Sequence, residues 1–136
     1  MMGIEKLIDA AKKEDWETVD EQLPEVCEDP SVVSWAYNEG IKDDDGNIRD
    51  LAVSLLEKAP ISESEFDDMR ETVYGLMTSD LNKYVKFRAA FALAAHGVGS
   101  HKAEVEQLLH EAEKDNEIAK IARGYLAKVK KWLEIV

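Results

Sequence analysis

One short run of this chain gathers the carboxylates that calcium chemistry would need. Residues 43–48 read Asp-Asp-Asp-Gly-Asn-Ile, and carboxylate oxygens are preferred ligands of Ca²⁺. With the glycine at position 6 of an EF-hand loop, Asp43 and Asp45 fall at ligand positions 3 and 5. Positions 1 and 12, which need an oxygen ligand and a bidentate Glu, are Ile41 and Ala52. The run is therefore predicted to be an acidic turn that caps a helix, and no calcium site is expected.

Three histidines and a single cysteine are the other residues that could hold a metal or act as nucleophiles. His96, His101 and His110 have no Cys or carboxylate at ligand spacing, and no His-Glu-x-x-His motif is present. Cys27 has no recognisable catalytic partner and is predicted to be a small buried residue. Neither a phosphate-binding glycine motif nor Gly-x-Ser-x-Gly occurs. We therefore expect no catalytic residue, no metal site, no cofactor and no enzymatic activity.

Basic side chains gather on two segments of the C-terminal half, interleaved with the aromatic residues Tyr84, Phe87 and Tyr125. The basic residues are Lys83, Lys86 and Arg88 in the first segment, and Lys120, Arg123, Lys128, Lys130 and Lys131 in the second. A surface of this kind would bind an acidic peptide or a phosphate group. Alternatively, the last three lysines lie near a helix C-terminus, where the helix dipole favours cations without any ligand.

Apolar residues recur at helical spacing along the chain, and no strand-like alternation bounded by hairpin turns is sustained. Caps and helix breakers divide this pattern into eight predicted helices, at about 3–13, 15–28, 30–40, 46–58, 63–79, 81–96, 101–114 and 115–134. Pro24 lies inside the second helix and is predicted to kink or split it. Paired in order, the helices form four helical hairpins, which must position any functional residue.

Three of these helices share a spacing that we call the register: a capping residue, a β-branched residue at +3, Ala at +7 and Leu at +11. The copies are Asp45-Ile48-Ala52-Leu56, Asn82-Val85-Ala89-Leu93 and Asp115-Ile118-Ala122-Leu126. They lie 37 and 33 residues apart, a period typical of stacked helical repeats. A small Ala lets two helices approach closely while the aliphatic residues fill the space beside it. The register therefore predicts buried Ala and Leu positions and Asp or Asn helix caps.

The register resembles that of the HEAT-like repeat family (armadillo-type α-solenoids), whose second helix often reads Asp-x-x-Val-Arg-x-x-Ala-x-x-Ala-Leu. One copy matches at Arg49 as well as at the register positions, and the next matches also at Lys86 and Ala92. The resemblance covers about residues 30–134 and implies an all-α fold, a right-handed α-α superhelix of about four helical hairpins. By this resemblance, 1–136 is a single domain with a degenerate N-terminal unit at 1–28 and hairpin repeats at 30–58, 63–96 and 101–134.

Charge is unevenly distributed along the chain, whose net charge is −12. Residues 1–70 hold 20 acids and 7 bases, a net of −13, whereas residues 71–136 hold 9 acids and 10 bases, a net of +1. The acidic half would repel phosphate backbones, so nucleic-acid binding is not expected. It would attract a basic protein surface, or it would serve only to keep the protein soluble.

The composition limits the structural class and the cellular location that we expect for this protein. A length of 136 residues suits one domain with a real core, and 45% hydrophobic and 34% charged residues are typical of soluble globular proteins. No apolar run approaches the roughly 18 residues of a membrane helix, and the N-terminal segment does not resemble a signal peptide. A single cysteine indicates a reducing setting. We therefore expect a cytoplasmic protein that does not enter the membrane.

Protein–protein interaction is the usual work of the HEAT-like family, so the resemblance implies a scaffold or adaptor for a protein or peptide partner. Its second helices line the concave face, which makes these residues candidate contacts: Arg49, Lys86, Arg88, Arg123 and Trp132. One alternative is an acidic inhibitor or immunity-type protein, in which Asp43–Asp45, Asp67 and Asp68 steer a basic partner. Phycobilin lyases and DNA-alkylation-repeat glycosylases have related repeats, so a lyase-like or nucleic-acid-binding function is a further alternative. Oligomeric state stays open.

Overall fold

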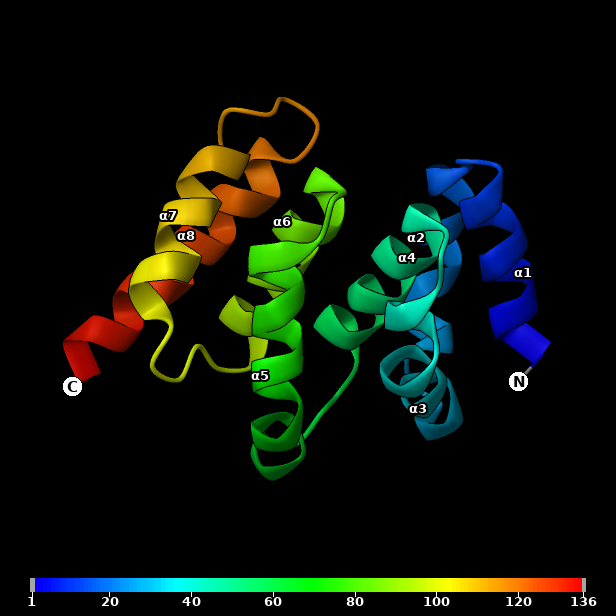
Figure 1. Ribbon diagram of the computed structural model, residues 1–136, viewed down its shortest axis with the longest axis horizontal. Coiled ribbons are helices and arrows are strands. Elements are labelled where there is room, and N and C mark those ends of the chain that lie inside the picture. Colours follow the sequence, from blue (N-terminus) through cyan, green and yellow to red (C-terminus); the bar gives the residue numbers. More distant parts are fainter. Residues whose placement is uncertain (1, 136) are drawn as a thin grey trace. The chain divides into compact units, whose positions relative to one another are not determined.

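A computed structural model describes the backbone of residues 2–135 and the side chains of residues 3–130. Within that range the chain is all-helical, with eight α-helices, one short 3₁₀ helix and no strand. It divides into two compact units, Met1–Ser62 and Glu63–Val136, which we call unit 1 and unit 2 (Figure 1). The boundary falls between the second and the third predicted hairpins.

Unit 1 is organised around its last helix. Its elements are α1 (Met2–Lys12), α2 (Trp16–Val26), α3 (Pro30–Asn38), the 3₁₀ helix η1 (Gly40–Lys42) and α4 (Gly46–Lys58). α4 packs against each of the others. Gly40 permits a close approach: a Cβ placed there would stand only 2.6 Å from the Cβ of Ala52 and 3.0 Å from the ring of Trp35. Small residues on both sides therefore let η1 lie directly on α4.

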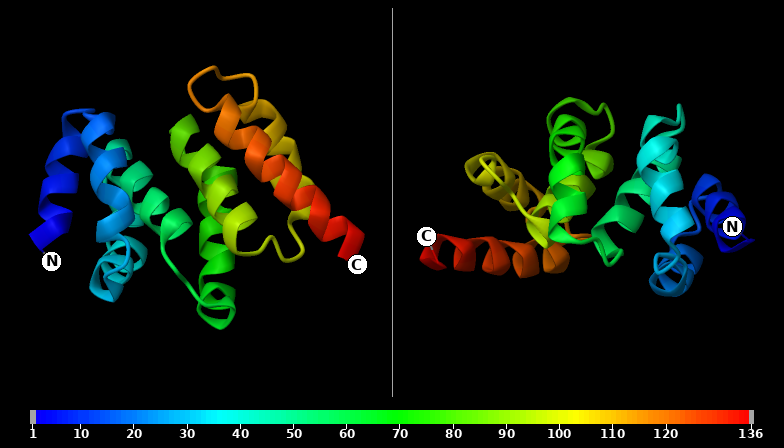
Figure 2. Two further views of the ribbon diagram at one scale, coloured as in Figure 1. Left: turned by 180° about the vertical axis from the view of Figure 1, so that it is seen from behind. Right: turned by 90° about the horizontal axis from the view of Figure 1, so that it is seen from below.

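Unit 2 is organised around α6. Its helices are α5 (Glu63–Ser79), α6 (Lys83–His96), α7 (Lys102–Ala112) and α8 (Ala119–Ile135). α6 packs against α5, α7 and α8, and α7 also packs against α8. In the left view of Figure 2, α8 is drawn in front of α7 and beside α6, and no other helix of unit 2 is drawn over it. One side of α8 is thus buried in the unit and the other is left uncovered by it.

The register positions have the structural roles that their spacing predicts. The side chains of Asp45, Asn82 and Asp115 accept the backbone N–H of the residue two positions on, at 2.8, 2.9 and 3.0 Å. All nine aliphatic and Ala positions of the three copies are buried, with at most 6% of the surface of any residue exposed. Each cap satisfies a backbone donor that a helix N-terminus otherwise leaves unpaired.

Two of the capped turns carry a second cap. Asp43 accepts the N–H of Asp45, and Asp80 accepts the N–H of Asn82, both at 2.8 Å. The residue between the two caps points outward in each turn, and Leu81 is 99% exposed. Its counterpart Asp44 is also exposed. The acidic run at 43–48 is therefore an acidic turn that caps α4, as predicted.

The course of α2 at Pro24 and the start of α8 differ from the sequence-based prediction, whereas the other helix ends differ from it by at most two residues. α2 runs through Pro24 and ends at Val26, so the predicted split is wrong. Pro24 lies in the last turn, where its missing N–H removes only one bond of the helix. α8 begins at Ala119, although Asp115 caps the preceding turn. The Asp115 carbonyl accepts the N–H of Ile118, three residues on, which makes this first turn 3₁₀-like instead of α-helical.

Among the described helices, none combines the length and the apolar character that crossing a membrane requires.

The packing of the register predicts a sharp difference between two alanines of α8. Ala122 is fully buried, whereas Ala127 is exposed. We expect Ala122→Leu to lower the free energy of unfolding by about 1–3 kcal/mol, because the extra atoms have no room. Ala127→Leu is the matched control and should change it by less than about 0.5 kcal/mol. Urea denaturation followed by circular dichroism measures both; equal effects would contradict the role given to the register.

Candidate interaction surface

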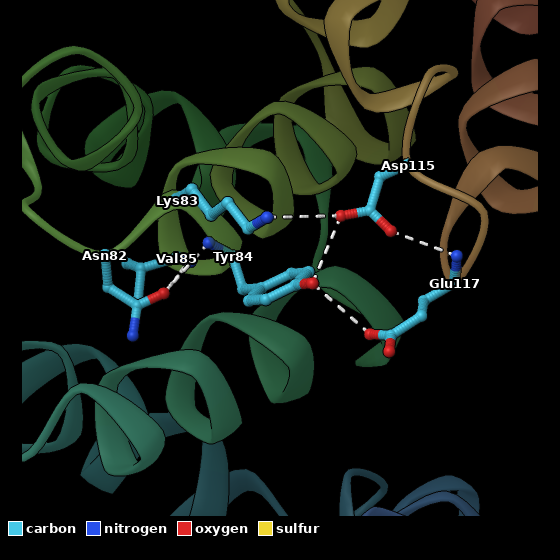
Figure 3. Close-up of polar contacts among 6 residues, drawn as sticks. All are labelled: Asn82, Lys83, Tyr84, Val85, Asp115 and Glu117. Atoms are coloured by element: carbon cyan, nitrogen blue, oxygen red, sulfur yellow. Dashed lines mark hydrogen bonds and ion pairs between the residues drawn. The ribbon is translucent and has the colours of Figure 1, made fainter.

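The N-terminal ends of α6 and α8 are joined by a group of four side chains, Lys83, Tyr84, Asp115 and Glu117, which we call the cap cluster (Figure 3). The Tyr84 hydroxyl donates to Asp115 Oδ2 at 3.1 Å, with Glu117 Oε2 at 3.2 Å as a second acceptor. Lys83 Nζ lies 3.6 Å from Asp115 Oδ2. Asp115 therefore caps its own turn with one oxygen and binds α6 with the other.

The electrostatics of the cap cluster favour the protonated form of Tyr84. Burial, the hydrogen bond to Asp115 and the two nearby carboxylates raise the pKa of Tyr84 to about 12. The pKa of Asp115 is lowered, chiefly by the Glu117 backbone N–H that its carboxylate accepts, with Tyr84 and Lys83 adding to the effect. At neutral pH Tyr84 is thus a hydrogen-bond donor to a charged acceptor. Its role is to connect two helices, and it is a poor base or nucleophile.

A second polar group holds the loop between α6 and α7 against α5. His101 Nε2 lies 2.8 and 2.9 Å from the carboxylate oxygens of Glu71, and its ring stacks on Tyr74 with centroids 3.6 Å apart. Arg70 Nε donates to the Gly97 carbonyl at 3.0 Å. A carboxylate–imidazole pair is part of a catalytic triad. Within residues 3–130, however, no hydroxyl or thiol is hydrogen-bonded to the other ring nitrogen of His101.

The remaining metal candidates are also engaged in local contacts. The ring of His96 lies 5.0 Å from that of Phe66, and His110 Nδ1 lies 3.5 Å from Glu113 Oε1. Cys27 is buried as predicted, which raises the pKa of its thiol. In the part of the chain with described side chains, no three His, Cys, Asp or Glu residues are grouped so that they could hold a metal ion.

The predicted contact residues are placed as follows. The Arg49 guanidinium donates to the carbonyls of Asp43 and Asp44 at 2.9 and 3.0 Å, so it closes the turn before α4 in unit 1. Lys86 and Arg88 are half-buried on α6. Because they are two positions apart on a helix, they face different sides. Arg123 is exposed on α8. Trp132 lies outside the residues with described side chains.

The uncovered side of α8 is basic. Its exposed side chains include four cations, Lys120, Arg123, Lys128 and Lys130, which we call the basic face of α8. Residues 119–130 contain no acid. Lys128 Nζ also donates to the Ala95 carbonyl at 2.7 Å, in the last turn of α6. The sequence-based prediction included all four residues among the bases of the C-terminal half, yet only Arg123 among the candidate contacts.

No family model, no curated protein and no solved structure matches this chain. A function must therefore be inferred from the geometry and charge of the molecule.

The raised pKa of Tyr84 predicts a pH-dependent contribution to stability. Because the folded-state pKa of about 12 lies above the ordinary tyrosine value of 10.0, the contribution is complete below pH 10 and is lost as the pH rises through about 12. We expect Tyr84→Phe to lower the free energy of unfolding by about 1 kcal/mol at neutral pH, and this difference to shrink in strong base.

Ultraviolet titration of tyrosinate should show a component near pH 12 that Tyr84→Phe removes. Tyr74→Phe is the matched control, because the Tyr74 ring stacks on His101 and the loss of its hydroxyl leaves the ring in place. A late component that persists in Tyr84→Phe would show that another residue carries it.

Proposed function

We propose that this protein is a non-enzymatic HEAT-like repeat protein that serves as a scaffold or adaptor for a protein or peptide partner. The observation that carries this proposal is the pairing of α6 with α8. These two helices carry successive copies of the register, pack against each other and are connected by Tyr84 at their N-terminal ends. Successive repeats that pack mainly through neighbouring helices are the organising feature of helical solenoids.

The chemistry of the polar groups favours binding over catalysis. The caps fix the first turns of their own helices, and the cap cluster and the Glu71–His101 pair each hold one helix or loop against another. Such contacts build a rigid framework, and a rigid framework lowers the entropy that binding must overcome. In the proposed role, side chains between the register positions on α6 and α8 contact the partner, among them the half-buried Lys86 and the exposed Arg123. We place this role in the cytoplasm, in keeping with one buried cysteine.

A quantitative pull-down with the whole protein as bait, at physiological salt, tests the scaffold. We expect at least one protein to be enriched over a bead control, and Lys86→Glu to reduce its recovery severalfold, because a like charge at a contact is repulsive. Lys42→Glu is the matched control: Lys42 is exposed in unit 1. Enrichment of no protein, or equal recovery with both variants, would overturn the proposal.

One observation favours a second candidate, an acidic inhibitor or immunity-type protein. Unit 1 holds 16 acids and 6 bases, a net of −10, whereas unit 2 holds 13 acids and 11 bases, a net of −2. Exposed negative charge steers association with a basic partner and makes it sensitive to salt.

The acidic turn allows a clean test of this second candidate. Replacement of Asp43, Asp44 and Asp45 together by Asn removes three charges, and Asn is as good a helix cap as Asp. If the second candidate is right, partner binding falls steeply with added salt and is largely lost in the triple variant while helix content is kept. Binding that is unchanged in the triple variant would exclude this turn as the contact.

A further inference from the structure

The basic face of α8 stands apart electrostatically from the rest of the molecule. Residues 119–130 carry four cations and no acid in a chain of net charge −12. Lys120, Arg123 and Lys130 form no ion pair with any side chain described in residues 3–130. Some bases elsewhere are paired, such as Lys13 with Asp9 at 3.0 Å and Arg70 with Asp67 at 2.9 Å. The three cations are thus left without an ion pair from the side chains that the structure describes in unit 2.

The cations frame two small residues. Lys120, Gly124 and Lys128 follow one another at spacings of four along the helix, and Arg123, Ala127 and Lys130 form the adjacent row at spacings of four and three. Residues three and four apart are neighbours on a helix surface. The centre of the face therefore has little side-chain bulk, and its ends are charged.

Gly124 has no structural role that would explain it. A Cβ placed on Gly124 would meet no atom within 4 Å, so no neighbour in the chain requires a glycine there. Glycine inside a helix costs about 1 kcal/mol relative to Ala. A bare backbone at the middle of a cationic face permits a second chain to approach it closely.

We propose that the basic face of α8 docks an acidic helix of a protein partner, whose carboxylates pair with Lys120, Arg123 and Lys130 while its backbone passes over Gly124 and Ala127. This proposal rests on the proposed function and specifies its partner. Charge complementarity selects the partner: carboxylates are attracted to α8 and are repelled by the net charge of −10 on unit 1. Carboxylates at helical spacing match the rows of cations on α8, which span roughly 15 Å.

A protein helix fits this face better than a nucleic acid does. A nucleic acid presents closely spaced phosphates along its whole length, whereas the cations of the basic face are confined to residues 120–130 of a chain with a net charge of −12. A short acidic helix confines its charge to the basic face. Binding of an oligonucleotide is nevertheless an outcome that the experiment below distinguishes.

The experiment measures fluorescence anisotropy of a labelled probe with the full-length protein at low salt. The probe is an Ala-rich helical peptide of roughly 15 residues with Glu at every fourth position; a peptide with Gln in place of Glu and a single-stranded oligonucleotide of equal charge are the comparison probes. We expect the Glu peptide to bind and the Gln peptide not to bind, and we expect the oligonucleotide to bind at least about tenfold more weakly.

Two double variants distinguish the effect of the basic face on binding from the effect of the net charge of the protein. Lys120→Glu with Arg123→Glu should weaken binding of the Glu peptide by about tenfold or more, through like-charge repulsion. Lys6→Glu with Lys12→Glu changes the net charge equally at exposed positions of α1 and should leave the affinity within about twofold. Gly124→Leu, which meets open space in the free protein, should also weaken binding severalfold without loss of helix content.

Several results would overturn the proposal: equal binding of the Glu and Gln peptides, equal effects of the two double variants, no effect of Gly124→Leu, or an oligonucleotide that binds as tightly as the Glu peptide. Failure here is separable from failure of the scaffold. If a pull-down partner depends on Lys86 while the Glu peptide does not bind, the scaffold stands and the proposed use of α8 falls. If the Glu peptide binds as expected while the pull-down enriches no protein, the scaffold falls and the basic face of α8 stands as a binding surface for acidic helices.

Discussion

The capping of helix N-termini by short polar side chains is the interaction on which the rest of this structure depends. Asp45, Asn82 and Asp115 each accept a backbone N–H that no carbonyl in the helix can reach. A cap fixes the residue at which a helix or its first turn begins, and the starting residue decides which side chains face inward. The buried Ala and Leu positions of the register therefore follow from where each cap lies.

Asp115 shows how a cap can also connect two helices. One carboxylate oxygen accepts the Glu117 backbone N–H, and the other accepts the Tyr84 hydroxyl on α6. The geometry of one turn is thereby coupled to the position of a neighbouring helix. Arg49 also supports a capped turn, because its guanidinium closes the turn that Asp43 and Asp45 cap. Polar side chains near the helix starts therefore stabilise local turns and the helix pair at the same time.

Helix bounds, caps and buried register positions could be predicted because they depend on residues a few positions apart. The contacts of Tyr84 could not be predicted, since its partners lie 31 and 33 residues away. No other copy of the register has a tyrosine two positions after its cap. Which charged side chains are accessible could not be predicted either. Sequence does not show that Arg49 is bound to two carbonyls, nor that Lys120 and Lys130 share the exposed side of α8 with Arg123. Which cations are already engaged depends on packing.

The double caps before α4 and α6 have a consequence for how this protein can change. In each turn the residues on either side of the tip hold the backbone, while the tip residue itself, Asp44 or Leu81, contributes nothing to the caps. One tip is acidic and the other is apolar, and the two turns cap their helices alike. A sequence can therefore exchange the tip residue, and with it the local chemistry of the surface, at little cost in folding free energy. These tips are sites where new specificity can arise while the framework stays intact.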